Sequence, residues 1–305
     1  MHNISPSEQI LRYSIIHSPA DEERLRVLSN ELQQDSRPWT TFSFHTKRSC
    51  CHVKCDANKF AARVIKLPHA NGRKEALECR DSTAKNIYHF ILKCKSTGLF
   101  NHPIISPGFI FELDASVHFL SYWWKNGNIL EYVSTNLVSH SVLAKLVRQM
   151  GEGLAYLHSH DIIHGNFCPY NVMITDAGRA TITDIGTYNL EAAAAIELGQ
   201  TVPPRSSLPY KPLEEFQFEG DIEVFTPSKN TDVYSFAASA YTVFTRKDIA
   251  ARGRACILAN PNGLLTLKRP DHIAPSTWTC LQNCWSLDVM TRPVMEDILV
   301  YLTTA

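Results

Sequence analysis

The chain lacks an excess of charge of either sign, and it lacks any long run of apolar residues. Its 305 residues include 30 basic and 30 acidic side chains, which gives a formal net charge of +0 at pH 7. A neutral chain offers no global electrostatic case for binding nucleic acid or an anionic membrane. No run approaches the roughly 18 apolar residues of a membrane span, and the first residues, MHNISPSEQ, lack the apolar core of a signal peptide. These absences favour a soluble, cytoplasmic protein.

The nine cysteines lack the paired spacing of a disulfide framework. Their odd number fits reduced thiols. One cluster, within residues 50–55, has the chemistry of metal ligands, but no second pair follows at a suitable separation. That cluster consists of Cys50, Cys51, His52 and Cys55. A structural metal there stays open as an alternative, whereas Cys280 and Cys284, four apart on an expected helix, are interpreted as buried small residues.

The composition is that of a globular protein, because 305 residues of which 44% are hydrophobic can bury a sizeable core. Residues 6–35 predict two helical pieces, which either pack on their own domain or dock a partner. Short alternating runs between 38 and 67 indicate strands of a small sheet. Apolar residues recur at helical spacing over 141–158, which predicts a core helix.

The most informative stretch is 161–186, which reads DIIHGNFCPYNVMITDAGRATITDIG. Within it, 172–174 and 180–182 are expected to form a hairpin that presents Asn171 and Asp184 at its two ends. The stretch resembles the catalytic and metal-binding centre of eukaryotic protein kinases, where H-R-D-x-x-x-x-N precedes D-F-G. The same frame here reads HGN at 164–166, N at 171 and DIG at 184–186.

The resemblance implies that Asn171 and Asp184 hold magnesium. It also implies that Asn166, beside His164, stands at the position of the catalytic base. A strand ending in Lys66 resembles V-A-I-K, whose lysine pairs with the nucleotide phosphates. Its glutamate partner has no clear counterpart on the next helix, expected at about 76–95.

Residues 119–133 resemble the kinase hinge and the helix that follows it. The resemblance implies that Ser121 is the gatekeeper and that Tyr122, Trp123 and Trp124 form the hinge, whose backbone would bond adenine. Together with Lys66, the expected nucleotide-binding residues are thus Ser121, Tyr122 and Trp123. Trp124 can equally be a core or interface aromatic residue.

Three further signatures follow in the family's order. Glu214 ends a segment similar to A-P-E, and Asp232 lies in TDVYSF, which resembles the start of the family's buried central helix. CW at 284–285 and RP at 292–293 are typical of the end of the domain. The resemblance implies a buried ion pair between Glu214 and Arg292, and breaking such a pair costs on the order of 3–5 kcal/mol.

The resemblance extends from residue 39 to the C-terminus. It implies an α+β, bilobal protein-kinase-like fold, with a small β-rich N-lobe and a larger, mainly helical C-lobe. The expected boundaries are a helical extension at 1–38, an N-lobe at 39–121, a hinge at 122–124 and a C-lobe at 125–305. The hinge, the H-G-N loop and the C-W…R-P ending are closest in style to the tyrosine-kinase-like branch.

Several departures from the family's pattern concern phosphate transfer. An amide at Asn166 cannot take a proton from a substrate hydroxyl, and general-base help is worth roughly 10²–10⁴ in rate. No glycine precedes Gly72, so the loop that covers the phosphates is missing. Cys168 and Tyr170 occupy places where the family's loop carries positive charge, and Gly165 replaces the arginine that receives an activation-loop phosphate.

These departures favour a pseudokinase that acts as a signalling scaffold or as an allosteric partner of an active kinase. A weak or atypical Ser/Thr/Tyr kinase that uses Lys66, Asn171 and Asp184 with ATP and Mg²⁺ is the alternative. A third possibility is an interaction domain that binds no nucleotide, in which Asn171 and Asp184 serve only backbone hydrogen bonds. The expected partners are proteins, with no nucleic acid and no membrane span.

Overall fold

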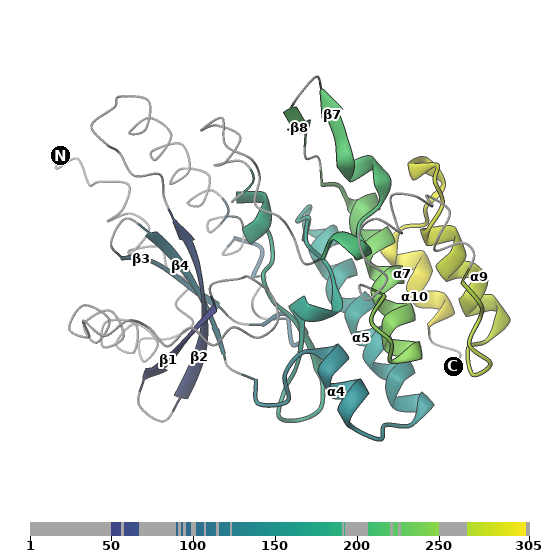
Figure 1. Cartoon of the computed structure of the whole chain (residues 1–305), viewed down its shortest axis with the longest axis horizontal. Helices are drawn as coiled ribbons and strands as arrows, with labels where there is room; N and C mark the ends of the chain where they lie inside the picture. The colour runs from purple at the N-terminus through teal and green to yellow at the C-terminus, as the bar shows by residue number, and fades with distance from the viewer. Residues whose placement is uncertain are drawn as a thin grey trace. The chain divides into compact units, whose positions relative to one another are not determined.

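The chain divides into two compact units, and Figure 1 labels their α-helices and most of their strands. The computed structural model describes residues 50–55, 58–66, 90, 93, 96–98, 102–106, 108–113, 116–122, 124–190, 192, 207–219, 222–224, 227–249 and 267–302. The first unit comprises 1–101, 106–123 and 193–200, and the second comprises 102–105, 124–192 and 201–305. The predicted helical extension at 1–38 and most of the predicted helix at 76–95 lie outside the described residues, and the predicted lobe boundaries stay predictions.

Four antiparallel strands form the sheet of the first unit, in the order β1-β2-β4-β3. They are β1 (Cys50–Cys55), β2 (Asn58–Lys66), β3 (Gly108–Leu113) and β4 (Ser116–Tyr122). Strand β2 coincides with the alternating run expected before residue 67, and β3 is rich in the aromatic and β-branched residues that suit a pleated surface. The cysteine and histidine side chains of β1 lie outside the described part of the structure, so the metal alternative there stays open.

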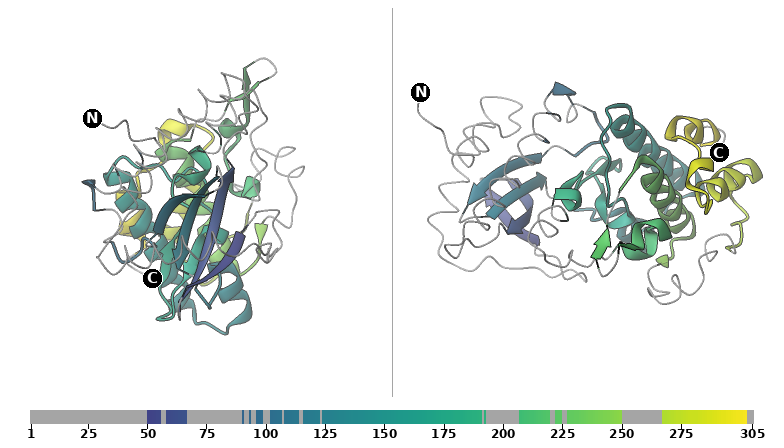
Figure 2. Two further views of the ribbon diagram at one scale, coloured as in Figure 1. Left: turned by 90° about the vertical axis from the view of Figure 1, so that its left-hand side faces the viewer. Right: turned by 90° about the horizontal axis from the view of Figure 1, so that it is seen from above.

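The second unit is built around two long helices, α5 (His140–Ser159) and α7 (Lys229–Thr245), which pack against each other. Helix α10 (Met295–Tyr301) packs on α5 and on α9 (Pro275–Cys284), as Figure 2 shows from two further directions. Helix α4 (Ile129–Thr135) contacts α7. The helix predicted at 141–158 is confirmed as α5, with one additional residue at each end. Among the described residues no helix has both the length and the apolar character needed to span a membrane.

Capping residues define where these helices begin. The Ser139 side chain accepts a hydrogen bond from the Val142 N–H, which satisfies one of the free donors at the start of α5. Ser228 and Thr231 form a reciprocal capping box at the start of α7. Helix α7 is buried on nearly every side, as expected for a central helix, and Arg246 ends it in the left-handed conformation.

The remaining elements are short. The hairpin of β5 (Val172–Ile174) and β6 (Ala180–Ile182) has the predicted residues and is therefore confirmed. A second hairpin, of β7 (Gln217–Glu219) and β8 (Ile222–Val224), was not expected from the sequence. The 3-10 turns are η2 (Pro169–Asn171), η3 (Leu208–Tyr210), η4 (Leu213–Phe216) and η6 (Val289–Thr291).

Aromatic and sulfur-bearing side chains close the core between α7 and α9. The rings of Trp278 and Trp285 meet edge to face with centroids 5.7 Å apart, and Tyr241 of α7 lies 6.1 Å from Trp285. Cys280 and Cys284 are buried free thiols, which confirms their interpretation as small core residues. The C-W signature therefore packs α9 onto the central helix.

Candidate functional site

The β5–β6 hairpin brings the two predicted metal ligands to one place. Beyond the last strand pair, the Thr183 N–H donates to the Asn171 carbonyl at 2.9 Å, and the Thr183 hydroxyl donates to the same oxygen at 3.1 Å. Asp184 is the next residue. Its φ is 60°, and the φ of Gly186 is 67°, so both residues have the left-handed backbone conformation. The chain therefore turns sharply at Asp184, beside the start of the strand that follows Asn171.

Asn171 is buried and directed by a hydrogen bond. Its Nδ2 donates to the Asn166 carbonyl at 2.8 Å, which fixes the orientation of the amide because only the nitrogen can donate. An amide oxygen and the carboxylate of Asp184 are a donor set that suits Mg²⁺ bound together with nucleotide phosphates. Among the described residues no group of three or more His, Cys, Asp or Glu side chains could hold a metal ion. The residues fit a magnesium ion shared with a nucleotide, and they do not form a metal cage of protein ligands alone.

His164 is fully buried in its neutral form. Its Nδ1 accepts a hydrogen bond from the Asn166 N–H at 3.2 Å, so its Nε2 carries the proton and donates to the Thr183 carbonyl at 3.0 Å. Burial lowers the pKa of His164 to about 4. The imidazole therefore joins the loop to the hairpin as a structural connector and carries no charge at neutral pH.

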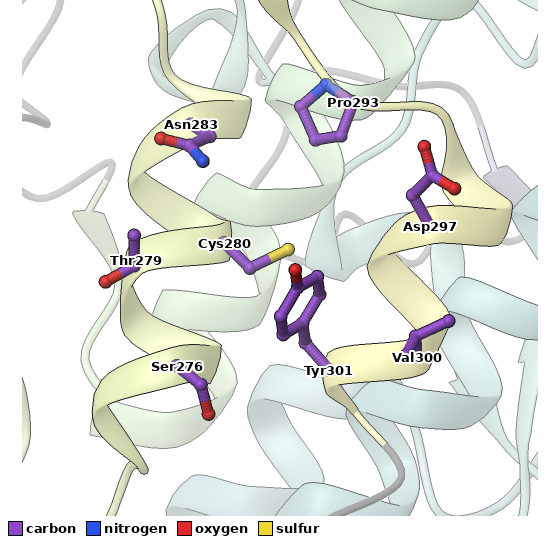
Figure 3. Close-up of a pocket in the computed structure, with 8 residues that line it drawn as sticks. All are labelled: Ser276, Thr279, Cys280, Asn283, Pro293, Asp297, Val300 and Tyr301. Atoms are coloured by element: carbon purple, nitrogen blue, oxygen red, sulfur yellow. The ribbon is translucent and has the colours of Figure 1, made fainter.

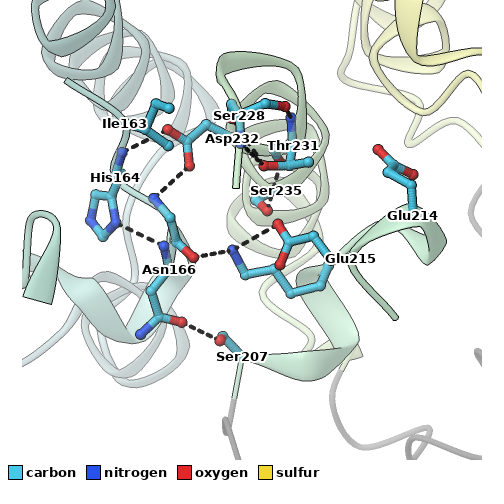
Figure 4. Close-up of polar contacts among 12 residues, drawn as sticks. Ile163, His164, Asn166, Ser207, Glu214, Glu215, Ser228, Thr231, Asp232 and Ser235 are labelled. Atoms are coloured by element: carbon cyan, nitrogen blue, oxygen red, sulfur yellow. Dashed lines mark hydrogen bonds and ion pairs between the residues drawn. The ribbon is translucent and has the colours of Figure 1, made fainter. Parts of the chain in front are cut away.

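Asp232 anchors the loop to helix α7. Its Oδ2 accepts from the His164 N–H at 2.8 Å (Figure 4), and its Oδ1 accepts from the Gly165 N–H at 2.9 Å. The same Oδ2 lies 3.1 Å from His158 Nε2. Burial alone would raise the pKa of Asp232, but the hydrogen bond with His158 and the nearby positive groups outweigh it, so the pKa lies below its ordinary value. The carboxylate is thus ionised and holds the loop by its backbone.

Asn166, at the position of the catalytic base, is completely buried. Its Oδ1 accepts a hydrogen bond from the Ser207 hydroxyl (Figure 4). Its Nδ2 is buried without a hydrogen-bond partner in the part of the chain that the structure describes. The group at the base position is therefore a neutral amide that is already engaged by the segment 207–216.

Gly165 stands where the family has the arginine that receives an activation-loop phosphate, and other side chains surround it here. Gly165 has a φ of 73°, and a Cβ atom there would overlap the side chain of Asn189. The Gly165 carbonyl accepts from the Lys211 ammonium at 2.9 Å, and that ammonium lies 3.5 Å from a carboxylate oxygen of Glu215. Lys211 and Glu215 are both buried. A buried Lys–Glu pair thus connects the segment 207–216 to the loop 164–171 without any phosphate.

Sequence reasoning missed Asn189, Lys211 and Glu215. For the last two a local signal existed, because a lysine and a glutamate four residues apart on a helical turn commonly pair. Their burial had no signal in the sequence. Asn189 is brought near Gly165 by tertiary structure alone.

Cys168 and Tyr170 supply no positive charge to the loop. Cys168 is buried in a cluster with Tyr210, against which Tyr170 also packs. The Tyr170 hydroxyl donates to Asp248, and the Tyr210 hydroxyl donates to the other oxygen of Asp248 at 2.8 Å. Burial and the neighbouring Asp248 raise the pKa of Tyr170. Neither side chain is basic, and both pack with Ala238 of α7 in the same cluster.

The expected ion pair between Glu214 and Arg292 is present. The two guanidinium nitrogens each bond one carboxylate oxygen, with Nη2 3.2 Å from Oε2. Arg292 also donates to the carbonyls of Ser286 and Asn230 and lies over the ring of Tyr234. The arginine side chain is 1% exposed, but the glutamate side chain is 22% exposed, so the pair is less buried than expected.

The predicted nucleotide-binding residues belong to the first unit. Lys66 ends β2 and pairs with Ser116, whereas Ser121 of β4 pairs with Ala61. Lys66 and Ser121 therefore lie at opposite ends of this strand pair. Tyr122 ends β4, Trp123 lies outside the described residues, and the side chains of Lys66, Ser121 and Tyr122 are likewise not described. Their roles toward a nucleotide stay predictions.

A comparison with protein families identifies the class. The family model for protein tyrosine and serine/threonine kinases matches residues 80–302, which is most of the chain. The chain therefore belongs to the protein tyrosine and serine/threonine kinase family. Members of this family generally use ATP and Mg²⁺.

Individual relatives are distant and much longer. The chain is 25% identical over 199 residues to the RGS domain-containing serine/threonine-protein kinase A of Dictyostelium discoideum, covering 63% of this chain and 16% of that protein. It is 24% identical over 200 residues to the tyrosine-protein kinase abl-1 of Caenorhabditis elegans, covering 61% of this chain and 15% of that protein. It is 25% identical over 195 residues to the mouse (Mus musculus) tyrosine-protein kinase TXK, covering 61% of this chain and 35% of that protein. The chain thus spans between 15% and 35% of the length of these relatives.

Proposed function

We propose that this chain is a pseudokinase, a kinase domain that transfers little or no phosphate and acts through binding and conformation. The observation that carries the proposal is the buried amide of Asn166, which accepts a hydrogen bond from Ser207 at the position of the catalytic base. An amide cannot act as a general base, and losing that help costs roughly 10²–10⁴ in rate.

Two further features of the loop support the proposal. Phosphoryl transfer depends on positive charge placed near the transferred group. At the two places where the family carries it, Cys168 is packed in the core and Tyr170 is hydrogen-bonded to Asp248. Among the described residues, the ammonium that contacts the loop is that of Lys211, and it is buried against Gly165 and Glu215.

We include ATP and Mg²⁺ among the proposed ligands. Asn171 and Asp184 would hold the ion, and Lys66 would pair with the phosphates while the hinge bonds the adenine. A bound magnesium ion would neutralise phosphate charge. The hydrogen bond from Asn171 to Asn166 supports this, because it leaves the amide in a defined orientation beside Asp184.

Incorporation of phosphate from labelled ATP tests the proposal. We expect no incorporation above background, either into the chain itself or into a generic protein substrate. Asn166→Asp alone should also stay at background, because the neutral loop and the missing glycine loop remain. Incorporation by the wild-type chain that Asp184→Ala abolishes would establish the second candidate, a weak or atypical kinase, and would overturn the first.

The Tm of the chain, measured with and without ATP, tests whether the chain binds nucleotide. A ligand that binds only the folded state raises Tm by mass action, so ATP with Mg²⁺ should stabilise the chain more than ATP alone. Asp184→Ala should remove the magnesium-dependent part of that shift. No shift under any condition would favour the third candidate, an interaction domain that binds no nucleotide.

The proposed mode of action is that of a signalling scaffold or of an allosteric partner of an active kinase, within the tyrosine-kinase-like branch. The sequence style of the H-G-N loop and of the ending around Trp285 and Arg292 supports that branch. The contacts of Ser207 and Lys211 with the loop support a conformation that needs no phosphorylation.

A further inference from the structure

Exposed large apolar side chains gather in one stretch of the second unit. Among the described residues, all but Leu137 lie between 287 and 301. They are Leu287, Met290, Val294, Val300 and Tyr301. Concentrations of exposed apolar residues mark interaction surfaces more often than chance, whereas single ones do not.

A groove of about 500 Å³ lies beside this stretch, between α9 and α10 (Figure 3). Val300 and Tyr301 line it from α10, and they are 65% and 45% exposed. Ser276, Thr279 and Asn283, one helical turn apart on α9, line the opposite wall. The groove therefore runs between two helices, and its exposed apolar side chains, Val300 and Tyr301, both lie on the α10 side.

The exposed charged side chains of residues 275–302 are all acidic. Residues 275–302 contain three acidic side chains, Asp288, Glu296 and Asp297, and all three are exposed. The only basic residue in the same stretch is Arg292, which is buried against Glu214. Asp297 lines the groove itself. A positively charged occupant would complement this surface.

We propose that the groove between α9 and α10 docks an amphipathic helical segment of a partner protein. Its apolar residues, spaced three and four apart, would cover Val300 and Tyr301, and a lysine or arginine would face Asp297. Helix α9 has 10 residues, or about 15 Å, which accommodates two to three turns of such a segment. The inference goes beyond the proposed function, because no residue of the candidate site lines the groove and docking does not require phosphate transfer.

Three fluorescent peptides of about 12 residues, roughly 18 Å as a helix, test the proposal by anisotropy. The first places leucines on one helical face and lysines on the others. The second replaces each lysine with glutamate. The third scrambles the first, so that the leucines no longer form a face. We expect the first to bind the full chain and the other two to bind about tenfold more weakly or not at all.

Matched variants locate the binding. Val300→Ser and Asp297→Lys should each weaken binding of the first peptide by about tenfold. Leu137→Ser and Asp271→Lys change an exposed leucine and an exposed aspartate outside the groove, and they should leave binding unchanged. Because all four side chains are exposed, each variant should stay folded, and only Asp297→Lys, which places a cation in the first turn of α10, should lower the free energy of unfolding, by less than about 1 kcal/mol.

Three outcomes would overturn the proposal. One is that none of the peptides binds. Another is that the control variants weaken binding as much as Val300→Ser does, which would indicate non-specific attraction. The third is concentration-dependent dimerisation in sedimentation that Val300→Ser abolishes, which would make a second copy of the chain the occupant. Phosphate incorporation is measured separately, so failure here is distinguishable from failure of the pseudokinase proposal.

Discussion

At the scale of residues, the loop 164–171 departs from the kinase pattern at positions that have acquired their own partners. Asn166 accepts from Ser207, and Tyr170 donates to Asp248. Gly165 leaves the space that Asn189 fills. Residues that share a contact respond to substitution together and not additively. Restoring one family residue at a time would therefore leave its new neighbour mismatched.

Gly165→Ala tests the fit between Gly165 and Asn189. A positive φ costs a residue with a Cβ about 1–3 kcal/mol, and here the Cβ would also displace the Asn189 side chain. Gly178 is a matched control, because its φ is 70° but the nearest atom to an added Cβ is 3.9 Å away. We expect Gly165→Ala to lower the free energy of unfolding by about 1 kcal/mol more than Gly178→Ala does. When both glycine variants also carry Asn189→Ala, urea titrations should give equal losses for the two. A difference that persists would refute the overlap between the added Cβ and Asn189.

Arg292→Ala should be among the most destabilising substitutions in the second unit. It leaves the Glu214 carboxylate without its cation and removes the bonds to the Ser286 and Asn230 carbonyls. We expect a loss of about 3 kcal/mol, at the lower end of the range for buried pairs because Glu214 is partly exposed. Arg148→Ala, which breaks the surface pair with Glu152, should cost less than about 1 kcal/mol. Equal losses in chemical denaturation would contradict this view of the pair.

At the scale of elements, the segment 207–216 is tied to the loop 164–171 by three separate polar contacts. Ser207 reaches Asn166, Lys211 reaches the Gly165 carbonyl, and Tyr210 shares Asp248 with Tyr170. All three contacts use side chains that need no modification. The two segments therefore form a preassembled unit, which suits a domain that works by presenting a fixed surface.

Lys211→Met tests whether the buried pair holds these segments together. The substitution removes the ammonium that lies 3.5 Å from the buried Glu215 carboxylate, and breaking a buried pair by removing one partner typically costs about 3–5 kcal/mol. The double variant Lys211→Met with Glu215→Leu should regain most of that loss, since replacing both partners by apolar groups is often neutral. Lys229→Met, which breaks an exposed pair with Asp161, should cost less than about 1 kcal/mol. Hydrogen exchange in 207–216 should accelerate in the single variant alone; unchanged exchange would show that the pair does not hold the segment.

At the scale of the whole molecule, burial of histidine makes the fold sensitive to acid. The pKa of His164 falls from 6.5 to about 4 on folding, and burial also lowers the pKa values of His102 and His272. Between pH 6.5 and about 4 the unfolded chain binds a proton at His164 that the folded chain does not. The contribution of His164 to stability is therefore complete above pH 6.5 and declines as the pH falls toward 4, and the contributions of His102 and His272 change in the same direction.

The predicted loss from His164 is on the order of 3 kcal/mol between pH 6.5 and pH 4. The free energy of unfolding, measured in urea at several pH values, should fall steadily across that window. In His164→Gln the slope should be smaller, while above pH 7 the two curves should run parallel. A slope that is the same in both proteins would show that His164 does not titrate on unfolding.

The sequence predicted the parts of the fold that rest on local patterns. The helix α5 is confirmed because a helical apolar stripe is a local signal, and the hairpin of β5 and β6 is confirmed because its turn residues separate two short runs within a motif frame of fixed spacing. The hairpin of β7 and β8 has strands of the same length, three residues, but they mix acidic with apolar residues and stand in no such frame. It was therefore missed, because such short runs carry too little periodicity to be recognised.

The candidate site was predictable only in part, for a related reason. Motif spacing indicated Asn166, Asn171 and Asp184, because the family's frame fixes those positions in the chain. Asn189 and Lys211 contact the loop from 24 and 46 residues away from Gly165 in the sequence. Nothing local marks such residues, because their role is set by where the fold places them.

The edge-to-face pair of Trp278 and Trp285 gives the second unit an intrinsic spectroscopic signal of whether α9 is correctly packed. Two indoles with centroids 5.7 Å apart are close enough for their excited states to couple. Far-ultraviolet circular dichroism, where the strong indole transition absorbs, should therefore carry an exciton signature that depends on α9 remaining packed against Tyr241 of α7. Any ligand or partner that shifts α9 would change that signal without a label.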